Sequence, residues 1–157
     1  MAMNSRQALE IFARYRDDAP VMVSSGGSGT ILSQLGHRTP TMYNTGMSYT
    51  SPACLGLALA RPDLKVVAVE GDGAMLMGLA NLATIGRYLP RNLVILVINN
   101  RTYLTTDRGE LETACGGRAD LAAAARSMGI EGALVADTPE QLEPQIRRAM
   151  REDGPWV

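Results

Sequence analysis

The chain has 157 residues, of which 46% are hydrophobic and 20% are charged, and its formal net charge at pH 7 is −1. These values are typical of one globular domain with an apolar core, so we expect a single domain over residues 1–157. A net charge near zero does not favour a nucleic-acid surface. The sequence has no apolar run of membrane-spanning length and no secretory signal pattern, and its two cysteines lie far apart. We therefore expect a cytoplasmic protein with neither a nucleic-acid nor a membrane partner.

Helical and strand-like patterns alternate along the chain. In chain order, the apolar spacing and the turn residues predict a helix over 4–15, a strand over 21–23, a loop over 24–28, a helix over 30–35, an irregular stretch over 36–50, a helix over 53–60, a strand over 66–69, a helix over 74–88, a strand over 93–98, a polar stretch over 101–118, a helix over 121–128, a strand over 133–135, a helix over 139–151 and the start of a strand at 154–157. The longest strands are apolar throughout, which is typical of a parallel sheet covered on both faces. We therefore predict an α/β fold with three layers, α/β/α.

Two polar motifs follow neighbouring predicted strands. Gly71-Asp72-Gly73 comes after one apolar strand and opens a helix, and Asn99-Asn100 ends the next strand. Ligands of parallel sheets bind beyond the carboxyl ends of the strands. Glycines let a ligand approach the backbone, and the N–H groups at the start of a helix bind anions. A carboxylate at such a place indicates a cation beside the anion, and Mg²⁺ prefers carboxylate and amide oxygens.

The two motifs together are more specific than either one alone, because each by itself is most often a turn. The sequence from Gly71 to Asn100, in its strand–loop–helix–strand context, resembles the thiamine diphosphate motif. Nearly the whole chain resembles the diphosphate-binding (PP) domain of thiamine diphosphate-dependent decarboxylases. Within that superfamily, residues 73–77, 82–86 and 120–122 are similar to the β subunits of sulfopyruvate decarboxylases and to the equivalent half of phosphonopyruvate decarboxylases.

The resemblance implies that the cofactors are thiamine diphosphate and Mg²⁺. The side chains of Asp72 and Asn100 and the carbonyl of Thr102 would bind the metal ion, and the N–H groups of Gly73 and Ala74 would bind the diphosphate. The other residues that the resemblance places against the cofactor are Gly26, Gly27, Ser28, Thr45, Met47, Gly71 and Tyr103.

Met47 occupies the position of a bulky apolar residue that, in this family, holds the two cofactor rings in a V shape. The backbone of Thr45 and Met47 would then hold the pyrimidine edge. Ordinary core packing is the alternative role of Met47. Tyr103 either covers the site or packs beside it. The sequence departs from the family at Arg101, where many relatives have glycine or another small residue.

The resemblance also implies a partner chain. In this family the glutamate that activates the pyrimidine lies in a separate pyrimidine-binding domain, for which this chain has no counterpart. We therefore expect an α subunit that carries that domain, in a dimer or larger hetero-oligomer, with residues 36–50 and 102–117 at the join. The substrate would be a 2-oxo acid, most directly sulfopyruvate, and the bound cofactor would supply the chemistry of decarboxylation.

Several candidate roles and functions stay open at this point. His37, the only histidine, could protonate an intermediate or be a surface residue. Arg101, Arg108 and Arg118 could bind a sulfonate or phosphonate group or be solvated. The alternative functions are a carboligase of the acetolactate synthase type, a β subunit of a 2-oxo acid:acceptor oxidoreductase, a cofactor-binding subunit without catalysis, and a nucleotide-binding domain. The last is disfavoured because the chain has no Walker lysine.

Overall fold

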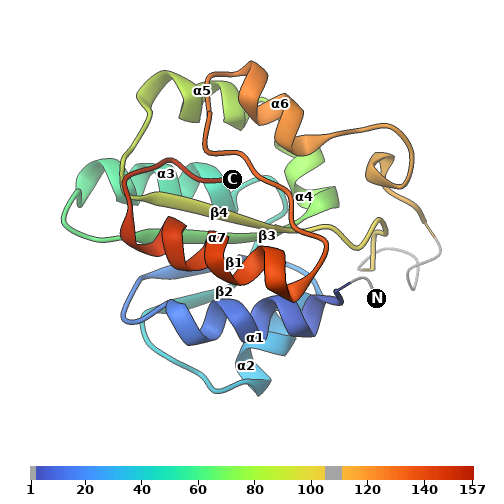
Figure 1. The fold of residues 1–157 in the computed structure, drawn as a ribbon, viewed down its shortest axis with the longest axis horizontal. Helices are drawn as coiled ribbons and strands as arrows, with labels where there is room; N and C mark the ends of the chain where they lie inside the picture. Colours follow the sequence, from blue (N-terminus) through green and yellow to red (C-terminus); the bar gives the residue numbers. More distant parts are fainter. Residues whose placement is uncertain (1–2, 105–110) are drawn as a thin grey trace.

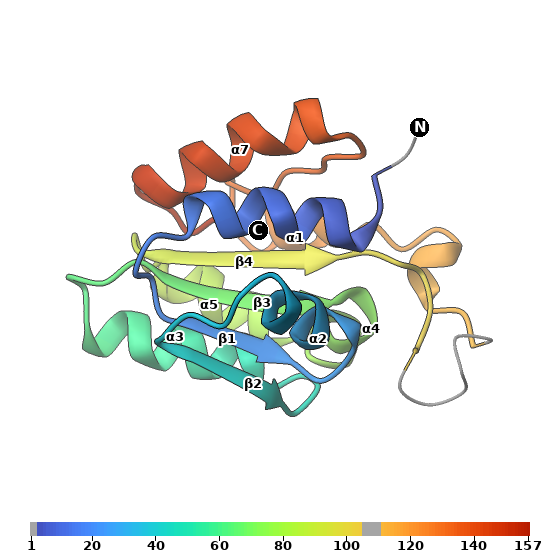
Figure 2. The same cartoon turned by 90° about the horizontal axis from the view of Figure 1, so that it is seen from below.

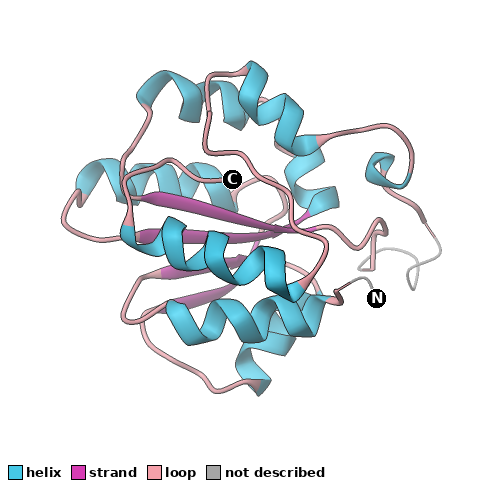
Figure 3. Ribbon diagram, in the orientation of Figure 1, coloured by secondary structure: helices cyan, strands magenta, loops and turns pink. Residues whose placement is uncertain are grey.

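A computed structural model of the chain describes residues 3–104 and 111–157. Within these ranges the elements follow in the order α1 (Ser5–Tyr15), β1 (Val21–Ser24), α2 (Gly27–Gln34), β2 (Thr41–Thr45), α3 (Thr50–Ala60), β3 (Val66–Gly71), α4 (Asp72–Met77), α5 (Asn81–Tyr88), β4 (Leu93–Ile98), the 3₁₀ turn η1 (Ala114–Gly116), α6 (Leu121–Ser127) and α7 (Pro139–Arg151) (Figures 1 and 3). Among the residues described, no helix has both the length and the apolar character needed to cross a bilayer.

The strands form a parallel sheet in the order β2-β1-β3-β4. One apolar core lies between the sheet and helices α1, α2 and α7, and a second lies between the sheet and helices α3, α4, α5 and α6. Figure 2 shows α1 and α7 together on one side of the strands. The predicted three-layer α/β/α fold is therefore confirmed.

The alternation of side chains along the central strands explains the two cores. Val67 and Val69 of β3 pack with α1 and α7, whereas Val66 and Ala68 of the same strand pack with α3 and α5. Because successive residues of a strand point to opposite faces, a strand buried on both faces has to be apolar throughout. The predicted strand over 93–98 agrees with β4 for the same reason.

The prediction of an irregular stretch over 36–50 is wrong, because β2 lies within it and pairs with β1 at the edge of the sheet. Its side chains alternate between half-buried and exposed, as an edge strand requires, so it has no continuous apolar run. The helix predicted over 30–35 also begins earlier, at Gly27, which shortens the preceding loop.

The prediction of one helix over 74–88 is wrong, because the chain turns between α4 and α5. At the turn a side chain on Gly78 would meet the Cα of Ser48 at 3.0 Å, and Nδ2 of Asn81 donates a hydrogen bond to the carbonyl of Ser48 at 2.9 Å. The helix is therefore broken where it contacts the loop that precedes α3.

The strand predicted over 133–135 is wrong as well. Only Gly132 forms a bridge there, to Trp156, which in turn forms a bridge to Val94 of β4. The N–H of Leu134 donates to the carbonyl of Val157 at 2.8 Å. The two segments thus run side by side next to β4 without forming a regular strand in the residues described.

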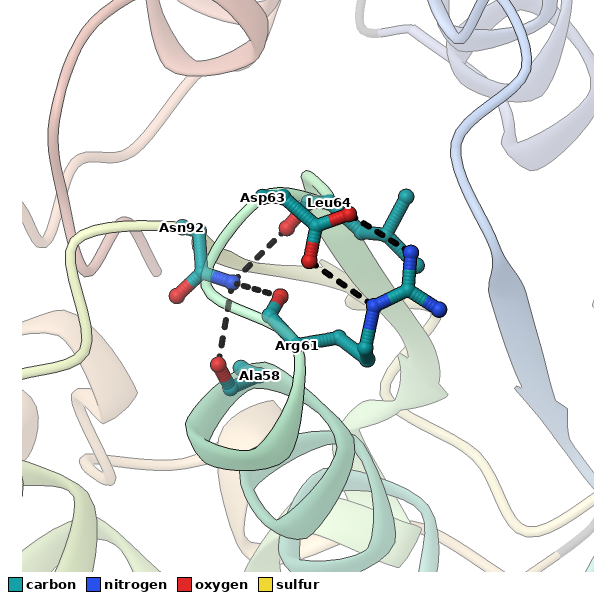
Figure 4. Close-up of polar contacts among 5 residues, drawn as sticks. All are labelled: Ala58, Arg61, Asp63, Leu64 and Asn92. Carbon is teal, nitrogen blue, oxygen red and sulfur yellow. Dashed lines mark hydrogen bonds and ion pairs between the residues drawn. The ribbon is translucent and has the colours of Figure 1, made fainter.

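A polar cluster joins α3 to the start of β4 at the amino end of the sheet (Figure 4). Nδ2 of Asn92 lies 2.7–3.1 Å from the carbonyl oxygens of Ala58, Arg61 and Leu64, and the guanidinium of Arg61 binds both carboxylate oxygens of Asp63. Asn92 therefore connects the end of α3 to the strand that carries the second polar motif.

Candidate functional site

A pocket lies at the carboxyl ends of β1, β3 and β4. Three segments that follow these strands line most of it, and a loop between β2 and α3 adds Met47. The pocket brings together nearly all of the cofactor-binding residues predicted from the sequence, namely Gly26, Gly27, Ser28, Met47, Gly71, Asp72, Gly73, Ala74, Asn100, Thr102 and Tyr103. Parallel sheets place their ligand sites at this edge.

Asp72 is the first residue of α4 and is almost fully buried, with 1% of its surface exposed. Its Oδ2 accepts a hydrogen bond from the hydroxyl of Thr113 at 2.5 Å. Its Oδ1 is also buried and has no hydrogen-bond partner among the described residues. Burying a carboxylate oxygen without a partner is costly, and a cation in the pocket would remove that cost. The donor set therefore fits a divalent metal ion.

Asn100 and Thr102 line the same pocket from the chain that leaves β4. Oδ1 of Asn100 accepts a hydrogen bond from the N–H of Thr102 at 3.1 Å, so the side chain folds back over its own loop. An amide oxygen has two lone pairs, and the second is free to bind a metal ion. The predicted ligands Asp72, Asn100 and Thr102 thus share one pocket.

Two helices begin at the pocket wall. α4 follows Gly71 and α2 follows Gly26, and neither helix start has a side-chain cap. The first N–H groups of a helix lack partners within the helix and attract anions. A Cβ added to Gly26 or Gly71 would meet no atom of the described residues within 4 Å, so both positions leave open space beside these N–H groups in that part of the chain. A diphosphate group fits this arrangement.

Tyr103 packs against the start of α4. A Cβ on Gly73 would lie 2.4 Å from Cε1 of Tyr103, so the close approach of the ring requires a glycine at that position. The structure therefore brings both Tyr103 and Met47 to the pocket.

Thr45 is the one predicted cofactor-binding residue that does not line the pocket. Its hydroxyl lies 3.0 Å from the carbonyl of Val23 and 2.5 Å from the hydroxyl of Thr50, and its carbonyl accepts hydrogen bonds from the N–H and the hydroxyl of Ser25. These bonds fix the start of the loop that carries Met47. A contact from the Thr45 backbone to a pyrimidine ring stays a prediction.

The other candidate residues lie away from the pocket wall. His37 is exposed, and its Nδ1 lies 3.3 Å from the hydroxyl of Tyr43. Arg101 and Arg118 are also exposed, and neither lines the pocket. Arg108 lies outside the described residues.

Two buried residues beside the pocket residues, Thr113 and Glu70, had no specific site role assigned from the sequence. Glu70 is almost fully buried on β3, and its Oε1 accepts a hydrogen bond from the N–H of Ser51 at 2.6 Å, at the start of α3. Burial raises the pKa of Glu70, and the hydrogen bond from Ser51 opposes the rise. The strand register places Val23 of β1 opposite Val69, the residue before Glu70. A glutamate at the end of an apolar strand, directly before Gly71, was a signal that could have identified it.

Comparisons with known proteins identify the class of this fold and site. The sequence pattern of the family described as thiamine pyrophosphate enzyme, C-terminal TPP binding domain, matches residues 24–157. The chain belongs to this family, which confirms the predicted fold and thiamine diphosphate as the cofactor.

Two relatives of the chain are a decarboxylase subunit and a decarboxylase. The chain is 30% identical over 158 residues to the sulfopyruvate decarboxylase subunit beta of Methanococcus maripaludis, which covers all of this chain and 83% of that protein. It is 34% identical over 152 residues to the phosphonopyruvate decarboxylase of Streptomyces viridochromogenes, covering 96% of this chain but only 37% of that protein. The resemblance to these two groups is thereby confirmed.

Solved structures share the fold. The benzoylformate decarboxylase of Polynucleobacter necessarius superposes on the whole chain with a TM-score of 0.83 at 18% identity. The thiamine diphosphate-dependent 4-hydroxybenzoylformate decarboxylase of Rhodococcus jostii superposes with a TM-score of 0.81 at 23% identity. The chain spans 32% of the length of each of these enzymes, so it corresponds to one portion of them.

Proposed function

We propose that the chain is the β subunit of a two-subunit 2-oxo acid decarboxylase that depends on thiamine diphosphate and Mg²⁺ and acts on sulfopyruvate. The products would be sulfoacetaldehyde and carbon dioxide. Residues 1–157 would form one domain, and catalysis would require an α subunit with the pyrimidine-binding domain, in a dimer or larger hetero-oligomer. The observation that carries the proposal is that Oδ1 of the buried Asp72 has no hydrogen-bond partner among the described residues and lies in a pocket shared with Asn100 and Thr102.

The proposal assigns tasks to several of the pocket residues. Asp72, Asn100 and the carbonyl of Thr102 would hold Mg²⁺, and the N–H groups at the start of α4 would bind the diphosphate. Met47 would orient the rings, and Ile31 would exclude water from the pocket wall. The bound cofactor supplies the electron sink for the loss of carbon dioxide.

Phosphonopyruvate is the second candidate substrate. It is favoured by the 34% identity to a phosphonopyruvate decarboxylase over nearly the whole chain. Sulfonate and phosphonate groups are both anions and would be recognised by similar charge-assisted hydrogen bonds. The two substrates therefore belong in the same experiment.

The test is to co-express the chain with its α subunit and to measure carbon dioxide release from sulfopyruvate, phosphonopyruvate and pyruvate. We expect turnover of sulfopyruvate by the complex and none by the isolated chain. A complex that holds the cofactor but releases carbon dioxide from no 2-oxo acid would contradict the proposal.

The metal assignment is tested separately. Asp72→Ala should abolish Mg²⁺-dependent binding of thiamine diphosphate to the complex. Asp63→Ala is the matched control, because that carboxylate is exposed in the turn after α3 and pairs only with Arg61 among the described residues. Retained Mg²⁺-dependent binding in Asp72→Ala would remove Asp72 from the metal site.

A further inference from the structure

We infer that Thr113 is a positioning residue of the metal site, and that its hydroxyl holds the carboxylate of Asp72 so that Oδ1 faces the metal ion. The inference rests on the proposed function, because it takes Asp72 as a metal ligand. Thr113 does not line the pocket, so it acts through Asp72 and not by touching the ligand.

The hydroxyl of Thr113 contacts the carboxylate of Asp72 directly. Oγ1 of Thr113 lies 2.5 Å from Oδ2 of Asp72, and both residues are buried, with 4% and 1% of their surface exposed. An ionised carboxylate can only accept hydrogen bonds, so the hydroxyl donates. A hydrogen bond from a hydroxyl to an ionised carboxylate is charge-assisted and is one of the stronger kinds.

This hydrogen bond makes the two carboxylate oxygens of Asp72 unequal. It occupies Oδ2, whereas Oδ1 stays buried without a partner among the described residues. A carboxylate held through one oxygen cannot rotate freely about its side-chain torsion. The other oxygen is therefore kept in one direction and is the atom left for a cation.

Backbone hydrogen bonds hold Thr113 in place. Its N–H donates to the carbonyl of Arg101 at 2.9 Å, and the N–H of Tyr103 donates to the carbonyl of Leu111 at 2.8 Å. Between these two bonds, Thr102 forms an antiparallel bridge with Glu112. Thr113 is thus fixed to the backbone that carries the third predicted ligand.

The hydroxyl of Thr113 therefore links the two halves of the metal site. Asp72 follows β3, and Thr102 belongs to the chain that leaves β4. The pairing of β3 and β4 ends at Gly71 and Ile98, so the sheet does not reach either ligand. The bond between Thr113 and Asp72 joins the ligands beyond the end of the sheet.

The test is a Mg²⁺ titration of the α–β complex at a fixed concentration of thiamine diphosphate, followed by cofactor binding. Thr113→Val keeps the shape of the side chain and removes the donor, and Thr113→Ser keeps the hydroxyl. We expect Thr113→Val to raise the half-saturating Mg²⁺ concentration by roughly 10- to 150-fold, from the usual strength of a hydrogen bond to a charged group. Thr113→Ser should stay within about threefold of wild type.

Thr138→Ala is the control for a loss of stability alone, because Thr138 caps α7 and does not line the pocket. It should lower the thermal midpoint without changing the Mg²⁺ titration. If Thr113→Val does not fold, Thr113→Ala carries the same expectation.

The outcomes separate this inference from the proposed function. If wild type needs Mg²⁺ and Thr113→Val has the same half-saturation, the positioning role is overturned and the proposed function stands. If the complex binds the cofactor with Mg²⁺ but turns over no 2-oxo acid, the substrate proposal fails and a shifted titration still supports the role of Thr113. If wild-type binding is independent of Mg²⁺, both fail.

Discussion

A substitution at Gly71 tests whether the diphosphate of the cofactor occupies the open space in the pocket. Its φ of −81° and ψ of 158° are extended backbone that any residue adopts, so conformation does not require a glycine there. A Cβ at this position would lie more than 4 Å from every atom in residues 3–104 and 111–157. If the space is filled by a diphosphate, Gly71→Ala places a methyl group against the ligand.

Two opposing effects determine how Gly71→Ala changes the free energy of unfolding. Alanine restricts the unfolded chain, which stabilises the fold by about 0.4–1 kcal/mol, but it is also a poorer residue than glycine before a helix by a similar amount. The free energy of unfolding should therefore change by less than about 1 kcal/mol. Displacing the diphosphate from one charge-assisted hydrogen bond costs about 1.5–3 kcal/mol, which weakens cofactor binding roughly 10- to 150-fold.

The assay is urea unfolding of the chain together with titration calorimetry of Mg²⁺ and thiamine diphosphate on the α–β complex. Gly56→Ala is the matched control, because Gly56 is exposed in α3 and an added Cβ meets nothing within 4 Å there either. It should stabilise the fold by about 1 kcal/mol and leave the affinity unchanged. Wild-type affinity in Gly71→Ala would refute the assignment of this pocket to the diphosphate.

Three further predictions concern the stability of the fold. Burial raises the pKa of Glu70 above its ordinary value of 4.5, so its contribution to stability is complete below the unfolded-state pKa and is lost as the pH rises through the folded-state pKa. As the pH rises above 4.5, the urea midpoint of Glu70→Gln should therefore increase relative to that of wild type. A difference between the two midpoints that does not change with pH would contradict the prediction that burial raises the pKa of Glu70. Gly86→Ala places a Cβ 1.8 Å from the carbonyl oxygen of Met128, so overpacking should exceed the gain in helix propensity and destabilise the fold by at least about 1 kcal/mol in urea unfolding. An unchanged or higher midpoint would mean that α5 and α6 do not pack as described. Asn92→Ala removes the donor to three carbonyl oxygens and should lower the free energy of unfolding by about 1–3 kcal/mol. Cofactor affinity should not change, because the cluster lies at the opposite end of the sheet from the pocket. A decrease of less than about 0.5 kcal/mol, which is usual for an ordinary surface substitution, would contradict this prediction.

The central part of the fold was predictable because its signals are local. The apolar runs of β3 and β4 indicate strands buried on both faces, and Asp72 and Asn100 come within two residues of the strand ends. The edge strand β2 was missed, because an edge strand needs apolar residues on only one face and its run contains polar residues at Thr41, Asn44 and Thr45. Its pairing with β1 is a property of the folded sheet.

The contacts that complete the site could not be predicted for a related reason. Thr113 lies 41 positions from Asp72 in the chain, and no periodic pattern connects them. The break between α4 and α5 depends on a contact with Ser48, from a loop more than thirty residues earlier. Long-range contacts of this kind leave no mark in the local pattern of apolar residues that indicates a helix or a strand.

The register of β3 and β4 has a consequence for how this site tolerates changes in length. Gly71 lies opposite Ile98, so the two metal-binding segments leave the sheet at the same level. One residue inserted within either strand would displace one ligand by about 3.3 Å and turn its side chain to the other face. Residues inserted beside Leu89, which is exposed in the turn between α5 and β4, would lengthen the crossover without entering either strand. We therefore expect this turn to accept a grafted peptide or a reporter domain while the metal site keeps its geometry.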